Sequence, residues 1–336
     1  MKKILLICYA LLAVAFILPF FLRDIPQNAE KTELIITPSD KPADSASAAA
    51  DSTGGKAKRE GKATVRVKIG EECLDMDMTD YLTGVLAAEM PASFNGEALR
   101  AQAVAARTYT LYCAALNRHA DAEVCTSPGC CQAWLGGDEL QERLGANWEE
   151  GYAKLRSAVE DTAGEYLMYE GKAAFAAFHS SSAGSTEASG EVWNAVPYLV
   201  SVTTPEIEAD VPGYVSTVTL TALDFRDTLL SLHPEADFTG APETWIGSIT
   251  RTPGGRVETA TLGGVSFTGG ELRQLFALRS TAFEVKYADG GFCFTVTGFG
   301  HGVGMSQYGA NVMAGQGADY KEILAHYYPG TTLAST

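Results

Sequence analysis

The segment Glu97-Ala-Leu-Arg-Ala-Gln-Ala-Val-Ala-Ala-Arg-Thr-Tyr109 decides the fold of this chain. It holds neither glycine nor proline, and Asn95 just before it is a good helix N-cap, so the sequence predicts a helix from about Gly96 to Leu116. Its many small side chains allow other elements to pack closely against this helix. A charge at Arg107 is therefore costly to bury unless a carboxylate or a sugar oxygen meets the guanidinium.

Glu89 lies upstream, after the apolar run Val85–Ala88 and before Met90 and Pro91. The proline disfavours helical geometry for Met90, so the preceding element ends here. A carboxyl group held at such an end among apolar neighbours has a raised pKa and can carry a proton near neutral pH. The alternative is a carboxylate that pairs with Arg107 for structural reasons alone, and the residue pattern leaves both interpretations open.

The first 22 residues predict a membrane anchor. Lys2 and Lys3 precede an uncharged run from Ile4 to Leu22, which as a helix rises ~28 Å and crosses the hydrocarbon core of a bilayer. A cleaved signal peptide is the alternative, but the run does not end in a small-residue cleavage site. The lysines predict a cytoplasmic N-terminus, with everything after Arg23 outside. Residues 23–62 have little to bury and predict a flexible linker.

The 336 residues carry a formal net charge of −16 and are 46% apolar. That apolar share suffices for one large core or two modest ones, and it excludes a chain that is disordered throughout. An acidic surface repels phosphate backbones, so the composition argues against nucleic acid as a partner.

A group of cysteines follows His119. Five residues separate His119 from Cys125, and five more separate Cys125 from Cys131. A Pro-Gly turn between the two cysteines bends the segment so that the three side chains converge. One imidazole and two thiolates are ligands that zinc accepts, while a disulfide outside the cytoplasm is an equally good interpretation. Cys130 departs from the regular spacing and is predicted not to bind metal, and Cys113 is a fourth ligand or a buried free thiol.

Two later segments are candidate walls of a binding site. The segment Phe178–Glu187 places His179 beside five hydroxyl side chains, which bind sugars in some proteins but more often satisfy their own backbone turn. The segment Gly298–Ala310 begins with alternating glycines, which indicates a close approach of its backbone to a neighbour. Gly304-Met-Ser-Gln-Tyr-Gly309 differs by one residue from the nucleophile elbow of hydrolases, so we do not predict a serine hydrolase.

The chain as a whole predicts an α+β fold of mixed helices and mainly antiparallel sheet. Alternation at Val65–Ile69 predicts the first strand of a main domain formed by 63–205 and 291–336. Residues 206–290 predict a smaller inserted α+β subdomain, with strands near 215–220 and 257–262 and helices near 222–232 and 270–278.

Four motifs occur in a fixed order: Ala88–Pro91, Glu97–Tyr109, the serine segment 179–186 with Val192-Trp193 and Pro197–Leu199, and Gly300–Ala310. Over residues 65 to about 333 they resemble the stage II sporulation protein D (SpoIID/LytB) family of bacterial cell-wall proteins. Arg100 and Ala183 depart from the residues usual in that family, which has lysine and glycine there.

The resemblance implies a lytic transglycosylase that acts, during engulfment of the forespore, on peptidoglycan whose stem peptides have been removed. Glu89 falls on the catalytic glutamate of the family. As general acid it would protonate the oxygen between N-acetylmuramic acid and N-acetylglucosamine, and as base it would take the C6 hydroxyl proton and so close a 1,6-anhydro ring. The resemblance implies these substrate-binding residues: Arg100, Arg107, His179, Ser180, Ser182, Thr186, His301, Ser306, Gln307 and Tyr308.

The resemblance also favours zinc at His119, Cys125 and Cys131, since some members of the sporulation branch carry a zinc site. The partners it implies are peptidoglycan glycan strands, the membrane, a cell-wall amidase and a membrane scaffold protein. The implied location is the cell membrane, with the catalytic domain on the extracytoplasmic side between mother cell and forespore. A non-enzymatic, glycan-binding activator of a cell-wall amidase is the alternative function.

Overall fold

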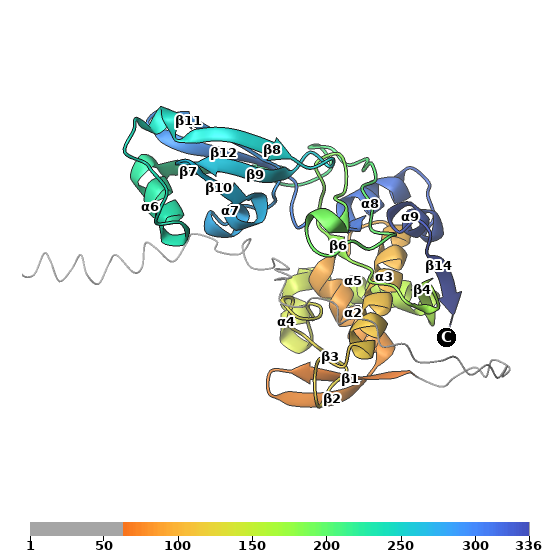
Figure 1. The fold of residues 1–336 in the computed structure, drawn as a ribbon. Helices are drawn as coiled ribbons and strands as arrows, with labels where there is room; N and C mark the ends of the chain where they lie inside the picture. Colours follow the sequence, from red (N-terminus) through yellow and green to blue (C-terminus); the bar gives the residue numbers. More distant parts are fainter. Residues whose placement is uncertain (1–62, 336) are drawn as a thin grey trace, which may run out of the picture. The chain divides into compact units, whose positions relative to one another are not determined.

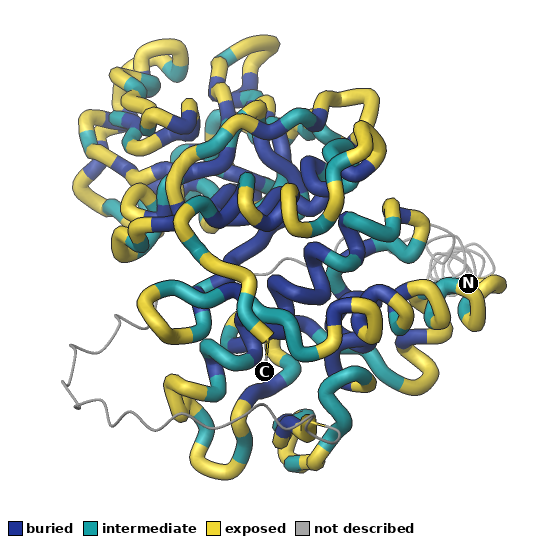
Figure 2. Tube along the Cα trace, turned by 90° about the vertical axis from the view of Figure 1, so that its right-hand side faces the viewer, coloured by how far each residue is buried: buried dark blue, intermediate teal, exposed yellow. Residues whose placement is uncertain are grey.

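The computed structural model describes residues 63–335, and the predicted anchor (1–22) and linker (23–62) lie outside them. Between residues 63 and 335, no helix has the length and apolarity needed to cross a membrane. This part of the chain is α+β with several antiparallel sheets, as predicted (Figure 1). Its buried apolar side chains form two separate cores, and the buried stretches inside them are dark blue in Figure 2.

The first core surrounds α3 (Gly96–Ala115), which confirms the predicted alanine-rich helix. Asn95 is its N-cap, and the Asn95 side chain accepts a hydrogen bond of 3.0 Å from the amide of Glu97. Small buried side chains along α3 let several helices pack directly against it. The helices of this core besides α3 are α2 (Met78–Glu89), α4 (Gly137–Leu144), α5 (Trp148–Asp161), α8 (Gln307–Gly315) and α9 (Tyr320–Tyr327), with 3₁₀ turns η1 (Gly145–Asn147) and η2 (Ser189–Glu191).

Three small sheets border these helices. The first has the order β2-β1-β3 and the second the order β14-β4-β5. The third pairs β6 with β13 in parallel, Phe178 opposite Met305 and His179 opposite Ser306, and so joins the serine segment to the glycine-rich segment. The strands are β1 (Thr64–Ile69), β2 (Glu72–Asp77), β3 (Val124–Cys125), β4 (Glu165–Tyr169), β5 (Lys172–Ala173), β6 (Phe178–His179), β13 (Met305–Ser306) and β14 (Thr332–Ser335).

The second core holds two antiparallel sheets, with orders β11-β12-β7 and β10-β9-β8, and is packed with aromatic rings. Trp245 is buried in it and stacks on Phe292 with ring centroids 5.6 Å apart. Its elements are β7 (Val215–Thr221), α6 (Ala222–Leu232), η3 (Pro242–Thr244), β8 (Ile246–Arg251), β9 (Val257–Leu262), β10 (Val265–Thr268), α7 (Gly269–Leu275), β11 (Phe283–Ala288) and β12 (Gly291–Thr297).

The limits of this second core differ from the predicted 206–290. Strand β12 pairs with both β7 and β11, so the core extends to Thr297. Residue 290 lies in the turn of the β11–β12 hairpin, and a hairpin is not divided between two cores. At the other end Glu206 is hydrogen-bonded to Ser182 and Ser306 of the first core, so the second core begins with β7.

Candidate functional site

Glu89 is the last residue of α2, and Met90 behind it is extended (φ −128°, ψ 142°), as its place before a proline predicted. The residue is partly exposed, while its carboxyl oxygen Oε1 is buried. Burial raises the pKa of Glu89 to about 8, against smaller lowering effects from Gln307, the backbone amide of Ala133 and the charge of Arg143. The carboxyl group therefore holds a proton at neutral pH, as a general acid must.

Gln307 is the side chain that contacts Glu89, with Nε2 donating to Oε2 at 3.5 Å. It is the first residue of α8, and Ser306 caps that helix by accepting a hydrogen bond of 3.2 Å from the amide of Gly309. Tyr308 follows, with its amide bonded to the carbonyl of Ser180 at 3.0 Å. The Tyr308 ring meets Phe94 edge-on at 4.9 Å. The fold thus brings Gln307 and Tyr308, which lie late in the sequence, next to the last residue of α2, which lies early in it.

The alternating glycines allow this approach, as expected from their pattern. Gly302 and Gly304 have φ values of +84° and +71°, a region that disfavours other residues. A Cβ atom on Gly304 would lie 1.9 Å from the carbonyl oxygen of Ala177, and one on Gly302 would lie 2.4 Å from the guanidinium carbon of Arg256. The backbone at Gly304 therefore packs directly against the residue before β6, and the backbone at Gly302 packs against the guanidinium of Arg256.

The two histidines near this segment form a buried pair, with ring centroids 5.7 Å apart. Nε2 of His179 lies 2.6 Å from the Ser182 hydroxyl, and Nδ1 lies 3.2 Å from the carbonyl oxygen of Val303. Burial lowers the pKa of His179 well below its usual range and that of His301 to about 3. Both rings are neutral at physiological pH and do not supply the catalytic proton.

Three predicted substrate contacts need correction. Ser182, Thr186 and Ser306 are each 0% exposed, so a bound glycan does not reach them. Their hydroxyl groups serve internal hydrogen bonds instead: Ser182 bonds His179, Thr186 accepts from the amide of Val202 at 2.9 Å, and Ser306 donates to Glu206 at 2.5 Å. The serine segment is an internal scaffold for the site, which is the commoner role of such runs. Ser180 is partly exposed and stays a predicted contact.

The two arginines of α3 also have structural roles. Arg107 is 5% exposed and donates to the carbonyls of Val159 (3.1 Å) and Thr162 (2.7 Å) at the end of α5 and of Glu165 (3.1 Å) at the start of β4. A cation at this place is also favoured by the negative end of the helix dipole. This corrects both the predicted substrate contact and the alternative pairing with Glu89. Arg100 is held by Glu97 and by Asp161, the latter at 2.6 Å.

A cluster of one histidine and three cysteines lies at the end of β3. The ligand atoms of His119, Cys125, Cys130 and Cys131 are all within 4.8 Å of one another, so the cluster could hold a metal ion. Nε2 of His119 lies 3.4 Å from Sγ of Cys131 and 3.6 Å from Sγ of Cys130, and the two sulfurs are 4.0 Å apart. Tetrahedral zinc spaces such ligands roughly 3.4–3.8 Å apart, so this donor set fits zinc after small movements.

Cys130 is thus a member of the cluster, contrary to the prediction from spacing. The amides of Cys130 and Cys131 both bond the carbonyl oxygen of Ser127, at 3.1 and 2.9 Å, and this tight turn directs two consecutive thiols to one place. Cys113 is buried and lies outside the four-residue cluster. All cysteines between residues 63 and 335 are free thiols, so no disulfide links them there.

The segment that follows the cluster leads directly to Glu89. Gln132 is buried and donates to Thr110 of α3 at 3.0 Å, and the amide of Leu135 bonds the carbonyl of Gly84 in α2 at 3.1 Å. Between them, the backbone amide of Ala133 acts on the Glu89 carboxyl. A metal ion bound at the cluster would therefore hold one wall of the site in place.

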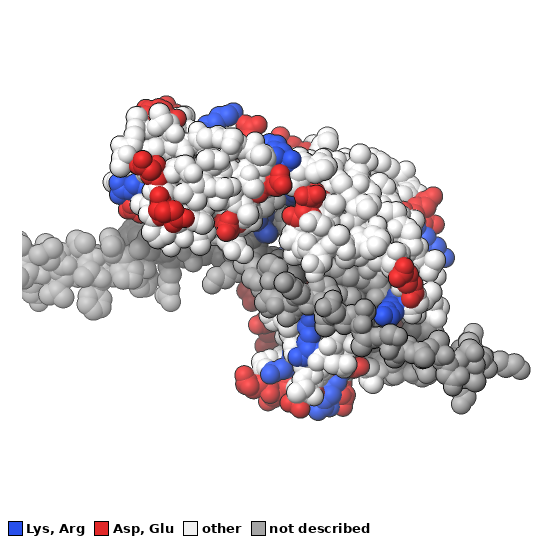
Figure 3. Space-filling view, viewed as in Figure 1, with Lys and Arg blue, Asp and Glu red and all other residues white. Residues whose placement is uncertain are grey.

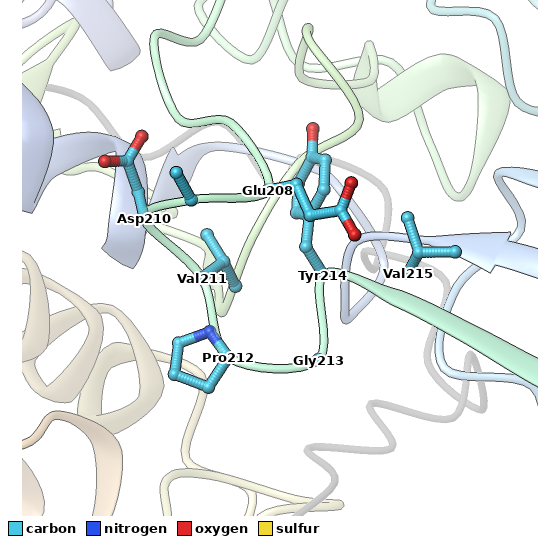
Figure 4. Close-up of a pocket in the computed structure, with 8 residues that line it drawn as sticks. Glu208, Asp210, Val211, Pro212, Gly213, Tyr214 and Val215 are labelled. Carbon is cyan, nitrogen blue, oxygen red and sulfur yellow. The ribbon is translucent and has the colours of Figure 1, made fainter.

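Two cavities lie apart from Glu89. Loop 208–215 curves around a cavity of about 340 Å³, shown in Figure 4 with Asp210 and Tyr214 on its wall. A second cavity, of about 270 Å³, lies under α4 between Trp134, Trp148 and Tyr152. None of the predicted site residues lines either one.

Three contributors to the site were missed by sequence reasoning: Glu206, Arg143 and the backbone of Ala133. Glu206 is 2% exposed and stands in a loop with no motif around it. Arg143 is the one positive charge on a short polar helix, and a backbone amide has no signature at all. Their only signal is position in space.

Known proteins similar to this chain identify the family. A family model described as stage II sporulation protein matches residues 71–169, which include Glu89 and the Cys/His cluster. Stage II sporulation protein D of Bacillus amyloliquefaciens is 37% identical over 266 residues, 77% of this chain and 75% of that protein. This chain belongs to the stage II sporulation protein D family. Its family counterpart in Bacillus subtilis (strain 168) is also 37% identical, over 265 residues and the same shares of both chains.

A further relative has a different name. The amidase enhancer of Bacillus subtilis (strain 168) is 33% identical over 308 residues, 76% of this chain and 40% of that protein. Membership of the sporulation family confirms the resemblance seen in the motifs.

Proposed function

We propose that this protein is a peptidoglycan lytic transglycosylase of sporulation. It cleaves the bond between N-acetylmuramic acid and N-acetylglucosamine in glycan strands that have lost their stem peptides. Glu89 is the catalytic residue. The observation that carries the proposal is the protonated carboxyl of Glu89 at the end of α2, oriented by Gln307.

The reaction needs one carboxyl group acting twice. Glu89 first donates its proton to the glycosidic oxygen, the bond from that oxygen to C1 of the muramic acid breaks, and positive charge develops on that ring. The C6 hydroxyl of the same ring then attacks C1 and returns its proton to the Glu89 carboxylate. A 1,6-anhydro bond forms, no water is consumed, and the enzyme regains its starting protonation. Glycosidases that hydrolyse the bond instead use two carboxyl groups.

The surroundings of Glu89 support the single-carboxyl scheme. The groups that act on its pKa are an amide side chain, a backbone amide and an arginine, and no second carboxyl of the described chain is among them. A pKa of about 8 allows donation at neutral pH and still permits the carboxylate to take a proton back.

We assign His119, Cys125, Cys130 and Cys131 to a zinc ion with a structural role. Four protein ligands close the coordination shell, as in structural zinc sites, whereas catalytic sites leave one position open. When bound, the ion supplies rigidity. The chain's own residues 131–135 then position the Ala133 amide against Glu89.

The proposed setting is the cell membrane, with residues 1–22 as the anchor and the catalytic domain on the extracytoplasmic side between mother cell and forespore. Proposed partners are the glycan strands, a cell-wall amidase that removes the stem peptides, and a membrane scaffold protein. The similarity to an amidase enhancer supports a second candidate function, a non-enzymatic, glycan-binding activator of that amidase.

Mass spectrometry of the products distinguishes the two. The full chain in detergent is incubated with glycan strands stripped of peptide, alongside Glu89→Gln and the exposed control Glu258→Gln. We expect anhydro-terminated fragments from the wild type and Glu258→Gln, and none from Glu89→Gln. Reducing ends, one water heavier, would overturn the transglycosylase, and full activity in a folded Glu89→Gln would overturn the role of Glu89. Amidase stimulation that survives Glu89→Gln, with no glycan cleavage by any variant, would favour the activator.

A further inference from the structure

Arg143 stands out among the exposed arginines of the described chain. Arg66, Arg118 and Arg251 are also exposed, and each has a hydrogen-bond partner in the protein. Arg143, near the end of α4, forms neither a hydrogen bond nor an ion pair with any residue between 63 and 335. Its guanidinium group is free to bind something else.

Several contacts place the end of α4 at the rim of the catalytic site. Helix α4 packs against α2, which ends at Glu89. A Cβ atom added to Gly151 would lie 3.4 Å from both the Leu144 side chain and the Ala92 side chain. Leu144, the neighbour of Arg143, is therefore close to Ala92, which lies three residues beyond Glu89. Burial raises the pKa of both Glu89 and Tyr308, and the charge of Arg143 opposes both shifts, so Arg143 lies within electrostatic reach of both side chains.

The other cation near Tyr308 is already engaged. Arg279 also lowers the pKa of Tyr308. Its Nη1 donates to the carbonyl of Gly213 at 2.9 Å, and its guanidinium carbon lies 4.3 Å from the ring centroid of Phe299. Of these two cations, Arg143 is therefore the one without a hydrogen-bond partner among residues 63–335.

The substrate of the proposed function carries a matching group, and the inference rests on that function. Each muramic acid bears a lactyl group on C3 of the ring whose C1 reacts, so this group lies within one sugar ring of Glu89 during cleavage. In a strand without stem peptides the lactyl group ends in a free carboxylate. With the stem peptide still attached, the lactyl carboxyl group is instead a neutral amide, and the peptide adds bulk there.

Charge makes a local cation necessary here. The strand without peptides is a polyanion, while this chain has a net charge of −16, and acidic side chains lie over both cores in Figure 3. Repulsion over a distance must be offset by a contact at the site. A guanidinium matches a carboxylate with two parallel hydrogen bonds, which a lysine does not reproduce.

We propose that Arg143 binds the free lactyl carboxylate of the muramic acid at the cleaved bond, and so selects glycan strands from which the peptide has been removed. An amide at this position offers no charge and only one acceptor oxygen to the guanidinium. The same contact fixes the ring whose C1 lies under the Glu89 carboxyl. Arg143 is thus a specificity-determining residue.

The test compares two substrates that differ in this group alone. One is glycan without stem peptides, and the other is the same glycan with its carboxylates coupled to methylamine. We expect the wild type to cleave the first with at least tenfold higher kcat/KM. Arg143→Gln should lose that preference, because its kcat/KM falls on the first substrate and not on the second. Arg143→Lys should keep part of the preference, and the exposed control Lys172→Gln should keep all of it.

Binding to the full chain with Glu89→Gln gives a readout that does not depend on cleavage. We expect this protein to bind the carboxylate glycan at least tenfold tighter than the amidated one, and the added Arg143→Gln to abolish the difference. Equal binding of the two glycans, or an equal loss on both in Arg143→Gln, would overturn the inference. If no variant cleaves either glycan but the binding preference depends on Arg143, the proposed enzyme fails and the recognition stands.

Discussion

The Ser306 hydroxyl donates to Oε1 of Glu206 at 2.5 Å, and this carboxylate oxygen also accepts a hydrogen bond of 2.8 Å from the amide of Ser182. Ser306 begins α8, whose first residue Gln307 contacts Glu89. Glu206 is therefore a buried positioning residue that fixes the start of α8, and through it the position of Gln307 beside the Glu89 carboxyl. The close approach also requires Gly309, where a Cβ atom would lie 2.6 Å from Oε2 of Glu206.

Removing this anchor should lower both stability and activity. In Glu206→Ala the hydroxyl of Ser306 and the amide of Ser182 lose a buried acceptor, which costs ~1–3 kcal/mol. Glu206→Gln keeps one acceptor oxygen and should restore most of both properties, while the exposed Glu208→Ala is the matched control. Thermal unfolding and product formation measure the effects. A Glu206→Ala protein with wild-type melting and rate would show that α8 is held by other contacts.

The pH dependence of the reaction should follow the Glu89 carboxyl. With a pKa of about 8, roughly nine in ten molecules carry the catalytic proton at pH 7, and the rate should fall as the pH rises through about 8. Initial rates of anhydro product formation across this range give the profile. A rate that keeps rising well above pH 8 would show that the free enzyme does not need this proton.

The same carboxyl group should link stability to pH. The folded protein keeps the Glu89 proton up to about pH 8, whereas the unfolded chain loses it near 4.5, so its stabilising contribution falls as the pH rises between these values. Glu89→Gln does not titrate, and its stability relative to wild type should increase across this window, by up to ~5 kcal/mol above pH 8. Melting temperatures of both proteins measure this difference, and a constant offset at all pH values would argue against the raised pKa.

Arg107 should matter for folding and not for substrate binding. Arg107→Ala removes a donor from three carbonyls at the end of α5 and the start of β4, and the unfolding midpoint should drop by ~5 °C or more. Folded Arg107→Ala should keep a wild-type KM, because the guanidinium is turned into the protein. Arg226→Ala, which removes a surface ion pair with Asp227, is the control. A raised KM with an unchanged melting temperature would show that Arg107 binds the substrate.

The metal cluster gives the last prediction. Cys125→Ser and Cys130→Ser should each reduce bound zinc by tenfold or more and lower the melting temperature, whereas Cys73→Ser, outside the cluster, should change neither. Zinc content should also fall on acidification, because thiols and imidazole must shed protons to bind. Elemental analysis of the purified proteins measures the zinc content. Protein that holds no zinc, with Cys125 in a mapped disulfide, would contradict the assignment.

The sequence by itself determined those features that depend on neighbours along the chain. Helix α3 with its Asn95 cap, the end of α2 before Pro91, and the close approach at Gly302 and Gly304 follow from local backbone preferences. The family also follows from the sequence, because its motifs are runs of adjacent residues.

Only the tertiary structure decided which side chains face the site. Serines and threonines bond equally well to sugars or to backbone, so the sequence could not show that Ser182 and Thr186 are fully buried. Spacing alone excluded Cys130, but the turn at Ser127 brings its thiol to the cluster. The roles of Glu206 and Arg107 depend on partners more than fifty residues away in the sequence, and the role of Arg143 depends on the packing of α4 against α2. A charged side chain acquires its partner only when folding brings distant groups together.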